Sequence, residues 1–190
     1  VSGTFTSVGG VPAPGLARFD GSSWSPLGAG PGFVPTALVH ETAGTVLASG
    51  NGGIARWNGL AWTPLVGQQS GVAVFRCVVE SHGQLIAAGQ FTAVGAVPVA
   101  NVARFDGVSW RELTPGCNGA VVAAVAAWDR LFVGGSFGRV GTVAAAHVAE
   151  FVDGSFRALG SGTDGPVTAL ACLPNGNLVA AGSFGQAGGV

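Results

Sequence analysis

The stretch "LARFDGSSW" (residues 16–24) decides the fold, because it returns along the chain. Its later copies are "IARWNGLAW" (54–62), "VARFDGVSW" (102–110) and the altered "VAEFVDGSF" (148–156). The closing aromatics are separated by 38, 48 and 46 residues and are Trp24, Trp62, Trp110 and Phe156. Self-similarity at such a period is the signature of a repeat protein.

A second marker recurs in step with the first one. The segment "GTFTSVGGV" (3–11) matches "GQFTAVGAV" (89–97), "GSFGRVGTV" (135–143) and "GSFGQAGGV" (182–190). A period of about 46 residues with this content predicts a unit of four antiparallel strands, as in the blades of a β-propeller. We therefore expect an all-β fold, a β-propeller or a propeller-like repeat array.

The apolar patterns within one unit support this prediction. The first two strands are continuous runs of small and aliphatic residues, such as "VTALACL" and "LFVGG", which are typical of a sheet buried on both faces. Small residues also allow neighbouring sheets to approach closely. The third strand alternates, with Leu16, Arg18 and Asp20 on one side and Ala17 and Phe19 on the other.

The 190 residues are enough for a single repeat domain with a sizeable core. Complete blades are expected at about 34–65, 72–113 and 121–159, and a split or partial blade at 1–27 and 167–190. The two ends carry equivalent segments that would compete for one place in a four-blade ring. We therefore expect a piece of a larger propeller, or a chain that completes its ring with a partner through open blade edges. The chain contains no Met and shows no signal peptide, so a processed chain or an excised part is expected.

The order of motifs resembles a known family. An apolar strand ending in Gly-Gly ("LFVGG") precedes a loop, and "RFDG" then leads to a Trp and a Leu, as in "WSPL", "WTPL" and "WREL". This order resembles kelch-type propeller repeats, and it is closer still to the Rax2-like repeats of secreted or surface-attached proteins. The resemblance implies an extracellular or cell-surface location.

Composition excludes some classes of partner. Only 9% of residues are charged and the formal net charge is −1, so the basic field of a nucleic-acid-binding protein is absent. The longest charge-free stretch, 165–190, is broken by "PNGN", which makes it a poor membrane span.

The repeated Asp-Gly or Asn-Gly pair has two interpretations. It suits a type I′ hairpin turn, whose two central residues need positive φ. The other interpretation is a ring of cation ligands made by Asp20, Asn58 and Asp106. A cation site needs more oxygen ligands than the sequence offers nearby, so we favour the turn and expect no metal.

The repeated tryptophans also have two interpretations. Trp24, Trp62 and Trp110 could stack sugar rings, as in propeller lectins, or they could pack between blades. Packing is favoured because Phe156 takes the same place in the fourth copy. Arg18, Arg56 and Arg104 are expected to cover blade edges or to pair with carboxylates such as Asp20 and Asp106; anion binding is the alternative.

One loop is shorter than its counterparts. Val46 and Ile54 are eight positions apart, whereas 17 positions separate Leu85 from Val102. The missing residues predict a notch at Asn51, Gly52 and Gly53, which is either a ligand site or a plain deletion in a tolerant loop.

Catalytic patterns are absent from the sequence. The spacing of His40, His82 and His147 does not match an HExxH-like motif. Glu41 and Glu80 lie where hairpin turns are expected, so we expect their side chains to be exposed to solvent. Cys77 and Cys172 lie in apolar runs, so we expect them to be buried free thiols. Cys117 is expected in a loop and is the better candidate for a reactive or intermolecular thiol.

We therefore expect a non-enzymatic structural or protein-interaction module without a cofactor. The alternative is a carbohydrate-binding propeller that uses Trp24, Trp62 and Trp110.

Overall fold

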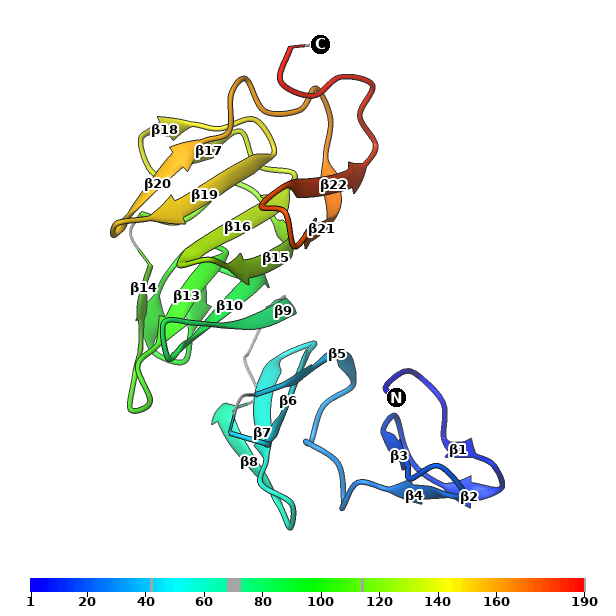
Figure 1. Cartoon of the computed structure of the whole chain (residues 1–190). Coiled ribbons are helices and arrows are strands. Elements are labelled where there is room, and N and C mark those ends of the chain that lie inside the picture. Colours follow the sequence, from blue (N-terminus) through cyan, green and yellow to red (C-terminus); the bar gives the residue numbers. More distant parts are fainter. Residues whose placement is uncertain (42, 68–72, 114, 190) are drawn as a thin grey trace. The chain divides into compact units, whose positions relative to one another are not determined.

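A computed structural model describes residues 1–190 except 42, 68–72, 114 and 190 (Figure 1). The described residues form antiparallel strands and turns and contain no helix, which confirms the all-β class. They therefore include no helix with the length and apolar character needed to cross a membrane. The chain divides into two compact units, Val1–Phe75 and Arg76–Val190, and each is described by itself.

Among the described residues, three sheets have four strands each, arranged in the sheet in the order of the chain. The first sheet consists of β5 (Pro35–His40), β6 (Val46–Gly50), β7 (Gly53–Trp57) and β8 (Trp62–Val66). The second sheet consists of β9 (Val74–Ser81), β10 (Gln84–Gln90), β13 (Val102–Phe105) and β14 (Trp110–Glu112). The third sheet consists of β15 (Val121–Ala127), β16 (Arg130–Gly135), β19 (Val148–Val152) and β20 (Ser155–Ala158). Within each sheet the strands therefore pair in the order in which they follow along the chain, as expected for the repeated unit.

Two further hairpins correspond to halves of such a sheet. The hairpin of β3 (Ala17–Phe19) and β4 (Trp24–Pro26) carries the first copy of the repeated stretch and corresponds to the third and fourth strands. The hairpin of β21 (Val167–Cys172) and β22 (Leu178–Gly182) corresponds to the first and second strands. The division into one domain, the number of blades and the closure of a ring stay predictions.

The first strand begins with the same irregularity in the first sheet, the third sheet and the β21–β22 hairpin. The register shifts between Pro35 and Ala37, and likewise at the start of β15 and β21. The residue opposite the shift is a glycine each time: Gly50, Gly135 and Gly182. A Cβ on Gly135 would lie 2.0 Å from the carbonyl oxygen of Ala120, so a side chain does not fit there.

A small hairpin fills the loop before the third strand in three places. These hairpins are β1 (Ser7–Val8) with β2 (Val11–Pro12), β11 (Ala93–Val94) with β12 (Val97–Pro98), and β17 (Arg139–Val140) with β18 (Val143–Ala144). Two backbone hydrogen bonds close the last of these loops, from Gly135 N to His147 O (2.9 Å) and from His147 N to Phe137 O (2.8 Å). Phe137 is fully buried and anchors this loop.

The core of the second unit lies between the second and third sheets. β10 packs against β15, and β21 packs against β15 and β16 (Figure 1). Buried side chains from these elements form one cluster: Ile86, Ala88, Val102, Leu113, Cys117, Val121, Leu131, Val133, Phe137, Val140, Ala145, Ala149 and Phe156. A Cβ on Gly134 would lie 2.6 Å from Cγ1 of Val167, so the small residue allows β16 and β21 to approach closely.

Candidate functional site

The repeated stretch carries a cross-strand aromatic pair in all four copies. The ring centroids are 5.0 Å apart in Phe19–Trp24, 5.5 Å in Trp57–Trp62, 5.2 Å in Phe105–Trp110 and 5.1 Å in Phe151–Phe156. In each copy the two residues are direct partners in the register of the third and fourth strands. Such a pair contributes about 0.5–1.5 kcal/mol beyond its buried area. The aromatic that closes the motif therefore stabilises its own hairpin.

The three tryptophans proposed as a sugar platform are packed to different degrees. Trp110 is 8% exposed, whereas Trp24 and Trp62 are half-buried. The indole N–H of Trp62 donates a hydrogen bond to the carbonyl oxygen of Leu27 (2.8 Å). A Cβ on Gly9 would lie 2.7 Å from Cδ1 of Trp24, so the chain passes closely over that ring. These contacts occupy part of the tryptophan surface, and a glycan platform stays a prediction.

The turn inside the repeated stretch differs from the expected type in three copies. The carboxylate of Asp20 accepts hydrogen bonds from the backbone N–H groups of Ser22 and Ser23 (2.9 and 2.8 Å). Asn58 and Asp106 cap their turns in the same way, and the following glycine alone has positive φ. The type I′ prediction is wrong there, because the side chain of the first residue satisfies the backbone donors of a longer loop.

The fourth copy has the turn that was expected. Val152 pairs with Ser155, and the two residues between them, Asp153 and Gly154, have φ of 52° and 75°. These positive values are those of a type I′ turn. Sliding the Asp-Gly pair by one place therefore changes a side-chain-capped loop into a two-residue turn.

Hydrogen bonding in these turns stabilises the charged form of the acids. The N–H groups of Ser109 and Val108 lower the pKa of Asp106 to about 2, and the guanidinium of Arg111 adds to this effect. The corresponding bonds from Ser23 and Ser22 lower the pKa of Asp20 well below its usual range. Both carboxylates are thus used to hold a turn.

The expected notch at Asn51, Gly52 and Gly53 is a tight connection between β6 and β7. Asn51 is exposed, and the N–H of Gly52 donates to the carbonyl oxygen of Ala73 (2.8 Å). A Cβ on Gly53 would lie 2.4 Å from Cδ1 of Phe33, so a phenyl ring covers this glycine. A role of these three residues in ligand binding stays a prediction.

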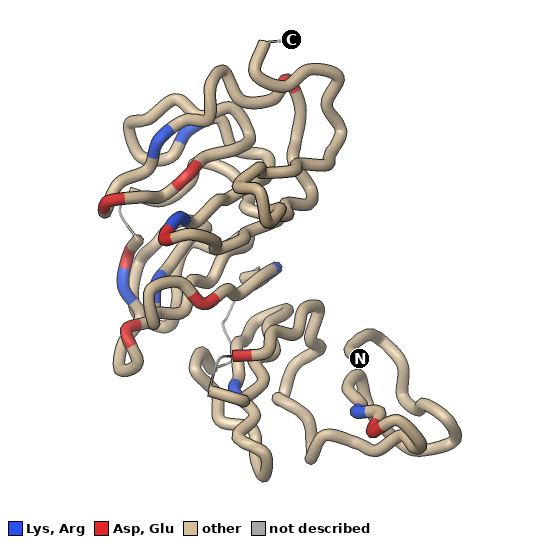
Figure 2. Tube along the Cα trace, in the orientation of Figure 1, with Lys and Arg blue, Asp and Glu red and all other residues tan. Residues whose placement is uncertain are grey.

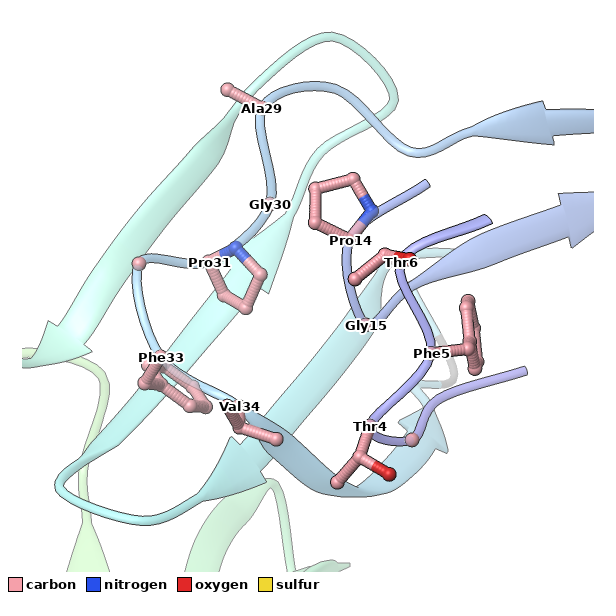
Figure 3. Close-up of a pocket in the computed structure, with 12 residues that line it drawn as sticks. Thr4, Phe5, Thr6, Pro14, Gly15, Ala29, Gly30, Pro31, Phe33 and Val34 are labelled. Carbon is pink, nitrogen blue, oxygen red and sulfur yellow. The ribbon is translucent and has the colours of Figure 1, made fainter. Parts of the chain in front are cut away.

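A cavity of about 470 Å³ lies elsewhere in the first unit (Figure 3). Phe5 and Pro14 line it from one segment, and Pro31, Phe33 and Val34 line it from another. Among the residues that the structure describes, no charged side chain lines this cavity, and its lining includes neither the three tryptophans nor Asn51–Gly53.

An ion pair is buried in the first sheet. Arg56 donates from Nε and Nη2 to the two carboxylate oxygens of Glu41 (2.8 and 2.7 Å), and the Thr45 hydroxyl also donates to Glu41. Burial raises the pKa of Glu41, but the hydrogen bonds and charge of Arg56 and the bond from Thr45 outweigh it and bring the pKa below the ordinary value. The prediction of a solvated Glu41 is wrong, because the 5% exposed residue lies beyond the end of β5 and turns back onto β7.

The third sheet has an ion pair with the charges exchanged. Glu150 occupies the position of Arg56, since Phe132 pairs with Glu150 as Leu47 pairs with Arg56. The guanidinium of Arg130 donates to Glu150 and lies over the ring of Phe132, 4.8 Å from its centroid. Glu150 is 8% exposed and Arg56 is half-buried, so this position carries a charged residue with a partner of opposite charge in both sheets.

The second sheet carries Arg104 at the same register position, opposite Ile86. The Nε of Arg104 is buried and has no hydrogen-bond partner within the described part of the chain. Asp106, its expected partner, is bound by Arg111 at 2.8 Å instead. Of the roles expected for Arg104, pairing with Asp106 is therefore not observed. The sequence did not distinguish Arg104 from Arg56, because the two lie in the near-identical stretches "ARF" and "ARW".

A second cavity, of about 570 Å³, lies between the second and third sheets. Its polar and aromatic lining includes His82, Gln84, Arg104, Trp128 and Arg130. Figure 2 shows that the charged residues of this unit are spread along its strands and turns. The lining combines a guanidinium without a partner with an exposed indole, which makes it the strongest candidate for a ligand site.

Sequence reasoning also missed an amide and a carboxylate that clamp loops. Oδ1 of Asn118 accepts hydrogen bonds from the N–H groups of Gly138 and Arg139 (both 2.9 Å). Asp164 does the same for Gly185 and Gln186 (2.8 and 2.9 Å). The signal was present as "CNGAV" and "TDGPV", an Asx-Gly pair ahead of the first strand in two consecutive repeats.

Burial perturbs the cysteine thiols. Cys117 is fully buried in the core and burial raises its pKa to about 12, and both disfavour the reactivity that the sequence suggested for it. Burial likewise raises the pKa of Cys77 to about 12. The described residues contain no group of His, Cys, Asp and Glu side chains that could hold a metal ion.

Comparison with known proteins adds no relative: no family model matches the chain, and no curated protein matches it.

Proposed function

We propose that the chain is part of a β-propeller of four-stranded blades, similar to kelch-type and Rax2-like repeats, that acts outside the cell or at the cell surface. In this proposal it is a structural or protein-interaction module that performs no bond chemistry. The observation that carries the proposal is the repeated hairpin. In all four copies its aromatic pairs across the hairpin, and in three copies its Asp or Asn caps the turn.

Two features supply surfaces for a protein partner. The turns of the second and third copies present aliphatic side chains, with Leu60 89% and Val108 90% exposed. β22 pairs with β21 along one edge only within the described residues of the second unit. An open strand edge is a template for pairing with another chain. The proposed partner is therefore a protein that contacts these turns, or one that adds a strand to β22.

Titration calorimetry with neutral and acidic glycans separates this proposal from a carbohydrate-binding propeller. The wild-type chain is compared with Trp24→Phe, Trp62→Phe and Trp110→Phe. We expect any heat of glycan binding to be the same in the three variants as in the wild type. A saturable heat that the tryptophan substitutions abolish would overturn the structural role and establish the carbohydrate-binding alternative.

A further inference from the structure

The cavity between the second and third sheets contains a charge that its own sheet does not neutralise. At the register position of Arg104, the first sheet has Arg56 bound to Glu41, and the third sheet has Glu150 bound to Arg130. The described residues offer Arg104 no such partner, although its Nε is buried. Arg104 as a whole is half-buried, but its buried Nε–H donor lacks an acceptor, and leaving such a donor unpaired costs free energy that an acceptor on a ligand would recover.

The other charged groups that line the cavity have side-chain contacts. Nε2 of His82 lies 3.5 Å from Oδ1 of Asp129, a contact that is an ion pair only when His82 is protonated. Arg130 binds Glu150, and Asp153 binds Arg157 at 3.1 Å. Arg111, directly opposite Arg104 in the register, binds Asp106. Among the described residues that line this cavity, Arg104 is therefore the charged side chain that has no side-chain partner.

The rim of the cavity carries an exposed aromatic residue. Trp128 and Asp129 form the turn between β15 and β16 with φ of 51° and 59°, and His82 and Gly83 form the matching turn of the second sheet with φ of 52° and 68°. Both turns have the positive φ values of a type I′ hairpin turn, which points the side chains of His82 and Trp128 away from the strands. Trp128 is 49% exposed, which leaves indole surface available to a ligand.

We propose that this cavity binds a carboxylate-bearing sugar of about one ring. A guanidinium binds a carboxylate through two parallel N–H···O bonds, and an indole offers a flat apolar surface to the C–H face of a pyranose. Ser81, His82 and Gln84 supply donors and acceptors for ring hydroxyls. The volume of about 570 Å³ lies within the range of small-molecule sites.

The site is separate from the tryptophans of the repeated hairpins, so it does not rest on the proposed structural role. If the cavity fails to bind the probe, the role of the hairpins is unaffected. If Trp24, Trp62 and Trp110 prove to be a glycan platform, this cavity is still tested by its own variants.

Ligand-observed NMR titration with sodium D-galacturonate tests the proposal, with D-galactose and inorganic phosphate as comparison ligands. We expect galacturonate to bind at least about tenfold more tightly than either comparison ligand, because a charge-assisted hydrogen bond between its carboxylate and Arg104 adds about that much affinity. Arg104→Gln should weaken galacturonate at least about tenfold. Trp128→Gly, a change on an exposed turn, should weaken both sugars. The control Arg139→Gln removes an exposed guanidinium outside the cavity and should change nothing.

Three results would overturn the proposal. The first is equal binding of galacturonate and galactose, because the charge would then contribute nothing. The second is unchanged galacturonate binding in folded Arg104→Gln or in Trp128→Gly. The third is binding of phosphate as tight as that of galacturonate, or no binding of galacturonate at all.

Discussion

The buried ion pair of the first sheet gives a prediction with a magnitude. Arg56→Met leaves the Glu41 carboxylate, whose side chain is 6% exposed, without two hydrogen bonds of 2.8 and 2.7 Å. Removing one partner of a buried pair costs about 3–5 kcal/mol. The side chain of Arg56 is itself 33% exposed and Thr45 still donates to Glu41, so we expect the lower end, about 3 kcal/mol at neutral pH.

The same substitution should reverse the dependence of stability on pH. In the wild type the pKa of Glu41 lies below its ordinary value of 4.5, so its contribution is present above that value and is lost as the pH falls through the folded-state pKa. In Arg56→Met, burial acts without the guanidinium and raises the pKa of Glu41 above the ordinary value. The folded variant then binds a proton more readily than the unfolded chain, so acidification toward the ordinary pKa restores stability.

Urea unfolding at neutral and mildly acidic pH, followed by tryptophan fluorescence, measures both effects. Arg18→Met is the matched control, because Arg18 occupies the equivalent place in β3 and is exposed; we expect a change within about 0.5 kcal/mol. The reasoning is refuted if Arg56→Met is no more destabilised than Arg18→Met. It is also refuted if the variant loses stability on acidification as the wild type does.

The packing leads to three more predictions, two for substitutions and one for a chemical reaction. Phe137→Ala should cost about 3–5 kcal/mol in thermal or urea unfolding, because the ring is fully buried beneath the β17–β18 loop. Trp128→Gly should raise the free energy of unfolding by about 1 kcal/mol, because a glycine adopts φ of 51° without strain; a loss of stability would show that the indole packs usefully. In native protein Cys117 should react with a thiol reagent more slowly than Cys172, since burial raises its pKa to about 12; equal rates measured by mass spectrometry would contradict its placement in the core.

The repeat was predictable because its information is local. Paired strands, apolar runs and a constant interval between the third-strand and fourth-strand aromatics are all visible in the letters around Trp24, Trp62, Trp110 and Phe156. The cross-strand aromatic pairs follow directly, since a residue and its partner five places on face each other across the hairpin.

Structural differences between the copies were harder to predict, because they depend on loop length and not on the identity of the residues in the motif. "LVHE" and "CVVE" look equivalent, but β5 ends at His40 and sends Glu41 into a longer turn, whereas β9 continues past Glu80 to Ser81. The carboxylate of Glu41 thereby reaches Arg56. In the same way an Asp-Gly or Asn-Gly pair gives a capped loop in three copies, whereas Asp153-Gly154 gives a type I′ turn, according to where the strand pairing stops.

The unpaired Arg104 could not be predicted from sequence at all. Arg104 in "ARF" and Arg56 in "ARW" have nearly identical sequence neighbours. The two arginines differ in whether a carboxylate contacts them across the sheet. The register shows that Arg56, Arg104 and Glu150 occupy equivalent positions, and within the described part of the chain only Arg104 lacks a side-chain partner.

The central claim is that the repeated hairpin is a structural element in every copy. Its most direct test is the free energy of unfolding of Trp24→Ala, Trp62→Ala, Trp110→Ala and Phe156→Ala, measured under one set of conditions. Every variant should be destabilised, by about 3–5 kcal/mol for Trp110 and Phe156, which are 8% and 6% exposed, and by less for the half-buried Trp24 and Trp62. Unchanged stability in these variants, together with loss of a glycan that the wild type binds, would contradict the claim.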